Sequence, residues 1–295
     1  MNLSYLIPLF LYLSPASDWK KEVDDLHVVT FNIRYANPGD GINRWEARVP
    51  IVEKYLTGDA PDIIGMQEAE YEQVLDVQRM LSGYAYLGTG RDDGKTGGEF
   101  TPIFYKKDRL ALIEQGQFWL SETPDVPGSK SWDAAITRIV TWAKFKDNGS
   151  GKAFYFFNTH FDHMGVEARR RSAHLLSEKI AEISSGFPVV VTGDFNIQKQ
   201  HPKHGNDLYE NLVNTFRQQN KLMDAAEVSQ TEVTTSGPTS TGFNPGWKSR
   251  QGNPIDYIFV NEGFTVASYR IDRIMEGDVF ISDHWPVVAK LSFTE

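Results

Sequence analysis

The stretch Val189-Val-Val-Thr-Gly-Asp-Phe-Asn196, which follows Pro188, is the segment from which the fold is predicted. An unbroken run of β-branched residues is typical of a strand buried on both faces, as in an α/β protein. We expect this strand to end at Gly193, so that Asp194 and Asn196 lie in the loop at its tip, where catalytic groups are often placed. Taken alone, Gly-Asp-x-Asn favours an Asx turn, in which both side chains bond to local backbone. The rest of the chain decides between these two interpretations.

The composition indicates one large domain with ample material for a core. The chain has 295 residues, of which 40% are hydrophobic, and a net charge of −9. A negative charge of this size argues against long-range attraction to a polyanion, which disfavours a processive nucleic-acid binder but leaves a nuclease open. The absence of cysteine excludes disulfides and zinc–thiolate sites.

The first 17 residues resemble a secretory signal peptide. Met1–Leu13 is almost wholly apolar, and the small residues of Ser14–Ser17 follow it, as at a cleavage site. The apolar run is too short to span a membrane, and it lacks the usual basic residues. The alternative is that the translation start was assigned upstream of the true start site, so that this segment is not a signal peptide. We expect residues 1–17 to be a signal peptide, residues 24–295 to form the catalytic domain, and the protein to be secreted or periplasmic.

Polar side chains lie at the ends of several other strand-like segments. The pairs are Leu26–Phe31 with Asn32, Ile63–Met66 with Glu68, Ala153–Thr159 with His160, and Val287–Phe293 preceded by Asp283 and His284. A carboxylate at a strand end is costly to bury unless it is paired or bound to a cation, which makes Glu68 a candidate metal ligand. The alternative is that Glu68 lies at an exposed strand end, where a carboxylate needs no cation.

Three more polar residues stand out beside these strand ends. Asp162 and His163 directly follow His160, and two histidines with an aspartate within four residues exceed what a core requires, which favours a functional cluster. Asp256 lies at the start of the apolar run Ile255–Val260, where an acid needs a cationic partner.

The remaining pattern predicts alternating helices and strands. Helices are expected at Arg44–Leu56, Glu72–Leu81, Glu167–Ile183 and Leu208–Gln219, a hairpin at Pro102–Tyr105 with Leu110–Trp119, and a further strand at Tyr269–Ile274. Four loops are expected around the site, at Ala36–Asn43, Arg91–Gly98, Pro124–Trp132 and Gly237–Asn253.

Six short motifs now stand in order along the chain. They are Thr30-Phe-Asn32, Gln67-Glu68, Asn158-Thr-His160, Gly193-Asp-Phe-Asn196, Ile255-Asp256-Tyr and Ser282-Asp-His284. Each is weak alone, but together they resemble the endonuclease/exonuclease/phosphatase superfamily, and most closely its deadenylase-like exonuclease branch. The resemblance runs from about Leu26 to Phe293. It implies a four-layer α/β sandwich, with two mixed β-sheets packed face to face and helices outside.

The resemblance also implies roles for the central residues. Glu68 would be the main ligand of Mg²⁺ (or Mn²⁺), helped by Asn32, and Asp283 would complete a second metal position. Asp194 would orient or deprotonate the attacking water, with Asn196 placing the water or the phosphate. In the same way His160 and His284 would hold the phosphoryl oxygens, and Asp256 would fix the orientation of His284.

Substrate contacts are predicted at five further positions. By the resemblance, Arg138 and Tyr105 correspond to substrate contacts, and Asp162 and His163, which directly follow His160, are expected to join them. Arg34 stands where some nucleases of the family carry an acid, so a metal ligand is missing there and Arg34 is expected to touch the substrate phosphate. This departure, Asp162-His163 and the negative net charge all weaken an assignment to duplex DNA.

These observations predict a Mg²⁺-dependent phosphohydrolase that cleaves a phosphate ester by direct attack of water. A phosphodiester, cleaved as by an exonuclease or endonuclease, is the first expectation for the substrate. The alternatives are a phosphomonoesterase acting on inositol or sugar phosphates, a sphingomyelinase-like lipid phosphodiesterase, and a non-catalytic binding protein on the same scaffold. We expect a monomer whose partner is its phosphate-ester substrate, with no stable protein partner.

Overall fold

The structure is a computed structural model that describes residues 25–201, 207–231, 237–249 and 252–295. The predicted signal peptide, residues 1–17, lies outside the described residues. In the described part of the chain, none of the helices combines the length and the apolar character that crossing a bilayer requires.

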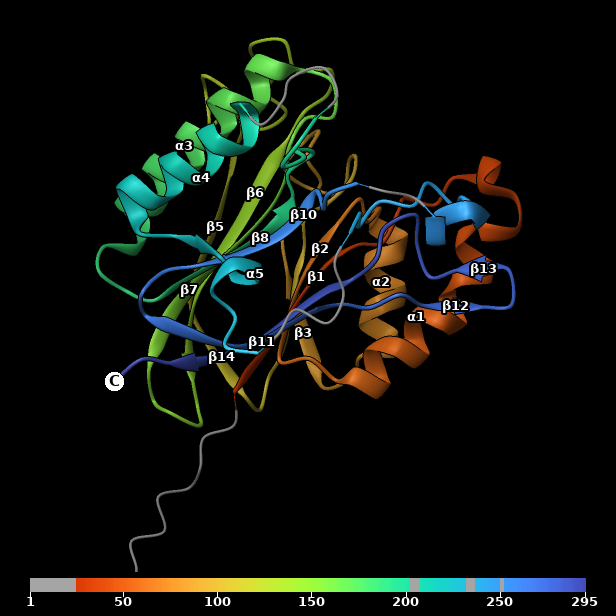
Figure 1. The fold of residues 1–295 in the computed structure, drawn as a ribbon, viewed down its shortest axis with the longest axis horizontal. Helices are drawn as coiled ribbons and strands as arrows, with labels where there is room; N and C mark the ends of the chain where they lie inside the picture. The colour runs from red at the N-terminus through yellow and green to blue at the C-terminus, as the bar shows by residue number, and fades with distance from the viewer. Residues whose placement is uncertain (1–24, 202–206, 232–236, 250–251) are drawn as a thin grey trace, which may run out of the picture.

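Two six-stranded sheets form the middle of the molecule (Figure 1). The first contains, in spatial order, β11 (Phe264–Ile271), β14 (Val287–Phe293), β1 (Leu26–Asn32), β2 (Ile63–Gln67), β4 (Ile103–Lys106) and β3 (Tyr84–Leu87). The second contains β5 (Leu110–Trp119), β6 (Ile139–Asp147), β7 (Ala153–His160), β8 (Val189–Asp194), β10 (Asp256–Val260) and β9 (Met223–Asp224). The short strands β12 (Met275–Glu276) and β13 (Val279–Phe280) form a separate hairpin.

Helices cover the outer faces of both sheets, as Figure 1 shows. The helices α1 (Trp45–Asp59) and α2 (Tyr71–Met80) lie on one side, and α3 (Val166–Ser184) and α4 (Asp207–Asn220) on the other. Shorter helical turns are η1 (Pro38–Asn43), α5 (Ala225–Val228) and η2 (Pro245–Ser249). Parallel and antiparallel neighbours occur in each sheet, so the predicted four-layer sandwich of two mixed sheets is confirmed.

Each sheet has a parallel pair of strands near its centre. In the first sheet β1 pairs with β2, and in the second β7 pairs with β8. A helix crosses over between the two strands of each pair, α1 in the first sheet and α3 in the second. The carboxyl ends of parallel strands meet at one edge of a sheet, which is where ligands of α/β proteins usually bind.

The side chains of β7 show how the two cores are divided. Successive residues of a strand point to opposite faces of the sheet. Phe154 and Phe156 therefore belong to the core that includes the interior of the first sheet, whereas Tyr155 and Phe157 pack under α3 and α4. His160 lies an even number of residues after Phe154 and Phe156 on the same strand, so its side chain points to the same face, toward the layer between the sheets.

The layer between the sheets becomes polar near the carboxyl ends of the parallel strands. Nε2 of Gln67 donates to Oγ1 of Thr30 (3.1 Å) and to Oδ1 of Asn158 (2.7 Å), and Oγ1 of Thr192 donates to the same Asn158 oxygen (3.0 Å). A Cβ at Gly65 would lie 2.2 Å from Oγ1 of Thr192, so only glycine lets the sheets approach this closely. These bonds join the two sheets directly beneath the polar strand ends.

Two expectations about strands were wrong. The segment β4 pairs with β2 and β3 in the first sheet, whereas β5 pairs with β6 in the second, so they do not form a hairpin. The three-residue connection, 107–109, is long enough to cross between two sheets packed about 10 Å apart, so its length does not distinguish the two arrangements. The strand expected at 269–274 runs instead from Phe264 to Ile271.

Candidate active site

The four central side chains come from the ends of the two parallel pairs. Asn32 ends β1 and Glu68 follows β2, while His160 ends β7 and Asp194 ends β8. Because the two sheets pack face to face, these four ends meet in the same layer. Asp256 begins the antiparallel strand β10 directly opposite Asp194, which brings a second buried carboxylate to the same place.

Asn32 connects the two principal carboxylates. Its Nδ2 donates to Oε1 of Glu68 (3.0 Å) and to Oδ2 of Asp194 (3.0 Å), and its Oδ1 accepts from the backbone N–H of Arg34 (3.0 Å). The side chain is fully buried. In this arrangement Asn32 holds Glu68 and Asp194 in fixed positions across the gap between the sheets.

His160 is held between Asp194 and Asn196. Its Nε2 lies 3.4 Å from Oδ2 of Asp194 and 3.1 Å from Nδ2 of Asn196, which also donates to the carbonyl of Phe161. Burial lowers the pKa of His160 well below its ordinary value, and the charge of Arg138 lowers it further. His160 is therefore neutral, so that one of its ring nitrogens donates and the other accepts.

The second histidine has the opposite protonation state. Nδ1 of His284 donates to Oδ2 of Asp256 at 2.8 Å, and its Nε2 lies 3.8 Å from Oδ2 of Asp194. Burial by itself lowers the pKa of His284, but the charges of Asp256 and Asp194 outweigh it and raise the pKa well above the usual range. The structure thus joins Asp256 to His284 and holds His284 as an imidazolium.

Asp194 is a buried carboxylate that can exchange a proton near neutral pH. Burial raises its pKa to about 7, with the charge of Asp256 adding to the rise and that of His284 opposing it. Its Oδ1 accepts from the backbone N–H of Asn196 (2.9 Å), which fixes the carboxylate orientation. A carboxylate with a pKa near the working pH is suited to take a proton from water.

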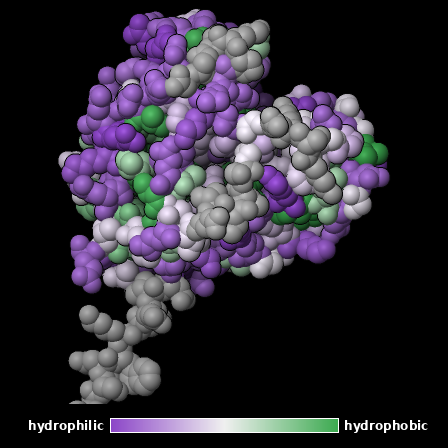
Figure 2. Space-filling model, in the orientation of Figure 1, coloured by the Kyte–Doolittle hydropathy of each residue, from purple (hydrophilic) through white to green (hydrophobic). Residues whose placement is uncertain are grey.

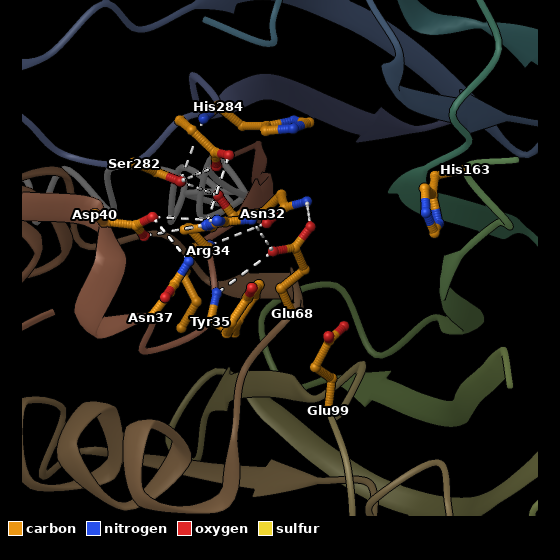
Figure 3. A network of polar contacts seen from close by, with 12 residues as sticks. Asn32, Arg34, Tyr35, Asn37, Asp40, Glu68, Glu99, His163, Ser282 and His284 are labelled. Carbon is orange, nitrogen blue, oxygen red and sulfur yellow. Dashed lines mark hydrogen bonds and ion pairs between the residues drawn. The ribbon is translucent and has the colours of Figure 1, made fainter. Parts of the chain in front are cut away.

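Arg34 places a positive charge among three carboxylates (Figure 3). Its guanidinium donates to Asp40 through Nε (3.1 Å) and Nη2 (3.2 Å), and it lies 3.8 Å from both Glu68 and Asp283. Burial lowers the pKa of Arg34, but these acids raise it above its usual value. Asp283 therefore has a cationic partner, Arg34, within the chain itself.

Arg138 and His163 lie together, whereas Asp162 has a different role. Nη2 of Arg138 is 3.2 Å from Nδ1 of His163, and both residues line the pocket. Asp162 is buried behind them, where its carboxylate accepts from four backbone N–H groups, those of Ala135, Ile136, Met164 and Gly165. Asp162 fixes the loops that carry Arg138 and His163 and does not line the pocket.

Tyr105 is not brought to the site. It lies on β4 in the main core, where its ring packs 4.8 Å from the ring of Phe145. An aromatic residue in a strand between two apolar layers gains more from burial than from exposure to the pocket. The predicted substrate contact at Tyr105 is therefore wrong.

Two charged residues that the sequence did not single out do line the pocket, Arg91 and Glu99. They form a bidentate pair, with Nη1 to Oε2 at 2.5 Å and Nη2 to Oε1 at 3.0 Å. Arg91 begins the charged, glycine-rich loop Arg91–Gly98, which was expected near the site, and Glu99 directly follows it. Glu99 is placed at the pocket by the next residue, Phe100, which forms antiparallel bridges with Ala69 and Gly90. Because these bridges are tertiary contacts, the sequence carried no signal for Glu99.

The backbone is strained at three site residues. Arg34, Glu68 and Asn196 have φ of 58°, 61° and 51°, in the left-handed region that side chains disfavour. Strain of this kind persists only where surrounding contacts enforce it and is concentrated at functional sites. At each of these residues it turns the chain directly after a strand end, so that the side chain points into the pocket.

The pocket has a volume of about 470 Å³. Its chemically distinctive lining residues are Arg34, Glu68, Arg91, Glu99, Arg138, His160, His163, Asp194, Asn196 and His284. Among the described residues, Glu68, His160 and Asp194 offer ligand atoms within 4.8 Å of one another. Two carboxylates and an imidazole at this spacing fit a divalent cation, and Asp283 is not part of the group because it faces Arg34.

A site of this chemistry, built at the carboxyl ends of paired strands in a four-layer sandwich, is that of a metal-dependent phosphoester hydrolase. The chain belongs to the endonuclease/exonuclease/phosphatase family, whose model matches residues 29–284. It is therefore an enzyme of this class, and the interpretation as a non-catalytic binding protein is set aside.

Solved structures resemble the chain over nearly its whole described length. An endonuclease/exonuclease/phosphatase from Bacteroides vulgatus is 41% identical, with a TM-score of 0.83 and coverage of 92% of this chain and 99% of that one. A mannosyl-6-phosphatase from Bacteroides thetaiotaomicron is 38% identical, with a TM-score of 0.80 and coverage of 91% and 100%. Nocturnin from Drosophila melanogaster is 24% identical over 61% of this chain, which spans only 30% of that protein.

Proposed function

We propose that the protein is a Mg²⁺-dependent phosphomonoesterase that acts on a phosphorylated sugar or a similar polyol phosphate. The observation that carries the proposal is the pocket of about 470 Å³, which contains the catalytic groups and is of the size that holds one small ligand. The mannosyl-6-phosphatase similarity, which extends over the whole of that chain, supports the same substrate class. The net charge of −9 also favours a small substrate over a polynucleotide.

The residues suggest a direct displacement by water. His284, as an imidazolium, and the neutral His160 and Asn196 hold the phosphoryl oxygens and stabilise their developing charge. Asp194 removes the proton from the attacking water, while Asp256 keeps His284 protonated and oriented. A divalent cation held by Glu68 supplies Lewis-acid polarisation of a phosphoryl oxygen when it is bound.

The choice of Mg²⁺ rests on the donor atoms. The candidate ligands are mainly carboxylate oxygens, and hard oxygen ligands suit Mg²⁺ and Mn²⁺ better than softer metals. Arg34 already places a positive charge beside Asp283 and Asp40, so the chain neutralises these acids without a second ion. We therefore propose one divalent cation per chain.

Replacing Glu68 by glutamine is expected to weaken Mg²⁺ binding about tenfold or more, because it removes a charged oxygen ligand while preserving shape. Calorimetric titration of the folded protein with Mg²⁺ measures both the affinity and the stoichiometry. The exposed Glu114→Gln variant is the control and should bind like the wild type. Unchanged affinity in Glu68→Gln would refute its role as a ligand, and a stoichiometry of two would refute the proposed single cation.

Substrate class is tested by comparing three esters with the wild-type enzyme and Mg²⁺. Mannose 6-phosphate is expected to give a kcat/KM about 100-fold or more above that of bis(p-nitrophenyl) phosphate, because the charged side chains that line the pocket suit the hydroxyls of a sugar better than a second aromatic ester arm. An oligoadenylate is the third substrate, since the similarity to a probable RNA exonuclease of Saccharomyces cerevisiae leaves RNA cleavage as the competing function. Faster release of nucleotides than of phosphate would overturn the phosphomonoesterase proposal.

A further inference from the structure

One wall of the pocket has no part in the chemistry described above. It consists of Arg91, Glu99, Arg138 and His163. Figure 3 shows Glu99 and His163 on the side of Glu68 away from Arg34, with open space between them and Glu68. The leaving group of a bound phosphate ester would therefore meet this wall.

Glu99 presents a carboxylate whose hydrogen-bonding capacity is only partly used. Each of its oxygens accepts one bond from Arg91, and its side chain is 18% exposed, against 11% for Arg91. A carboxylate has about four lone-pair sites, so acceptor positions remain free on the side of the pocket. Arg91 holds the carboxylate rigidly in place, because a bidentate pair fixes the geometry of both groups.

Arg138 supplies unused donors to the same wall. Its side chain is 4% exposed, and its Nη1 is buried without a hydrogen-bond partner in the described part of the protein, whereas its Nε faces Asp162 at 3.9 Å. Burial lowers the pKa of Arg138 to about 10, so it remains a cation at neutral pH. Buried donors without partners are costly, and a ligand in the pocket would satisfy them.

A wall that combines fixed acceptors with fixed donors suits hydroxyl groups. A hydroxyl both donates and accepts, so neighbouring hydroxyls of a sugar can donate to Glu99 while accepting from Arg138. A second phosphate has no donor at neutral pH and would face the negative charge of Glu99, but Arg91 and Arg138 would attract it. The wall is therefore complementary to a polyol, whose hydroxyls can use both kinds of group.

We propose that the Arg91–Glu99 pair is the subsite that recognises the hydroxyl groups of the leaving group, with Glu99 as the residue that accepts hydrogen bonds from them. This inference rests on the proposed phosphomonoesterase function and names the part of the substrate that the wall recognises. In this assignment Glu99 determines specificity, and Arg91 is a positioning residue that holds it.

The test compares Glu99→Gln with the wild type on two monoesters. Mannose 6-phosphate carries hydroxyls on its leaving group, and phenyl phosphate carries none. We expect kcat/KM for mannose 6-phosphate to fall about 10- to 100-fold, the effect of losing hydrogen bonds to a charged acceptor. The kcat/KM for phenyl phosphate should stay within about twofold, because its leaving group makes no such bonds.

A third substrate and a control variant separate specificity from structure. Fructose 1,6-bisphosphate carries a second phosphate, and its kcat/KM relative to mannose 6-phosphate is expected to rise in Glu99→Gln, since the repelling charge is gone. Glu114→Gln, on the exposed part of β5, removes a carboxylate elsewhere and should leave all three values unchanged. Thermal unfolding followed by circular dichroism checks that both variants are folded.

Each outcome has a distinct meaning. An equal loss on mannose 6-phosphate and phenyl phosphate would overturn the inference, because the pair would then support the whole site and not one leaving group. No loss on either monoester would also overturn it. If the wild-type enzyme hydrolyses neither monoester but cleaves phosphodiesters, the proposed function itself fails, and that result is visible before any variant is made.

Discussion

Replacing Asp194 by asparagine is expected to lower kcat about 1,000-fold or more, with the largest effect on activity of any single change in the chain. The amide has nearly the same shape and still accepts from the backbone N–H of Asn196, but it cannot take a proton from water. Steady-state phosphate release under saturating substrate and Mg²⁺ measures the loss. A variant with near-normal kcat would show that another group removes the proton.

The fold should survive this substitution, and the pH dependence of stability shows why. The folded pKa of Asp194, about 7, is above the ordinary value of an aspartate. Folding therefore favours the protonated form, so Asp194 reduces stability progressively as the pH rises from about 4 to 7. In metal-free buffer, the Tm of Asp194→Asn should exceed that of the wild type by more at pH 7.5 than at pH 4.5. The exposed Asp125→Asn variant should show no such trend.

Replacing Arg48 by methionine is expected to cause the largest loss of stability, about 3 kcal/mol or more. Arg48 is fully buried on α1, and its guanidinium donates to the carbonyls of Ile33, Arg34 (3.0 Å) and Asn43 (2.7 Å). Methionine fills a similar volume but leaves these buried carbonyls without a donor. Urea unfolding followed by circular dichroism measures the change in the free energy of unfolding.

The loss of stability should extend to the active site, because Arg48 holds the loop that directly follows Asn32. We expect weaker Mg²⁺ binding in Arg48→Met, as the connection from Asn32 to Glu68 loosens. Arg79→Met is the matched control, since Arg79 lies on α2 with its side chain 67% exposed, and it should change the free energy of unfolding by no more than about 0.5 kcal/mol. Equal effects of the two variants would refute the role of Arg48.

The distribution of hydrophilic and hydrophobic side chains on the surface agrees with the composition of the chain. Figure 2 shows one face of the molecule covered mainly by hydrophilic side chains, with hydrophobic ones in small separate patches. That distribution agrees with a chain in which 40% of the residues are hydrophobic and most of these are needed for two cores. The expectation of a monomer without a stable protein partner stays a prediction.

The sequence by itself determined the strands, their polar ends and the family. Runs such as Val189–Val191 specify buried strands through local β-branched character, and chain order places Asn32, Glu68 and Asp194 directly after them. Such signals are local, so they can be read without knowing where any segment lies in space. The matching of six motifs in order needs only the sequence as well.

Only the tertiary structure decided which of the candidates share a site. The local sequence around Tyr105 fits a core position and a pocket position equally, and the packing of Phe145 from the other sheet places it in the core. The carboxylate of Asp162 accepts hydrogen bonds from four backbone N–H groups. Asp283 pairs with Arg34, which comes from a distant part of the chain. Glu99 reaches the pocket because Phe100 bridges to Ala69. These outcomes depend on distances between segments far apart in sequence, which a local pattern does not contain.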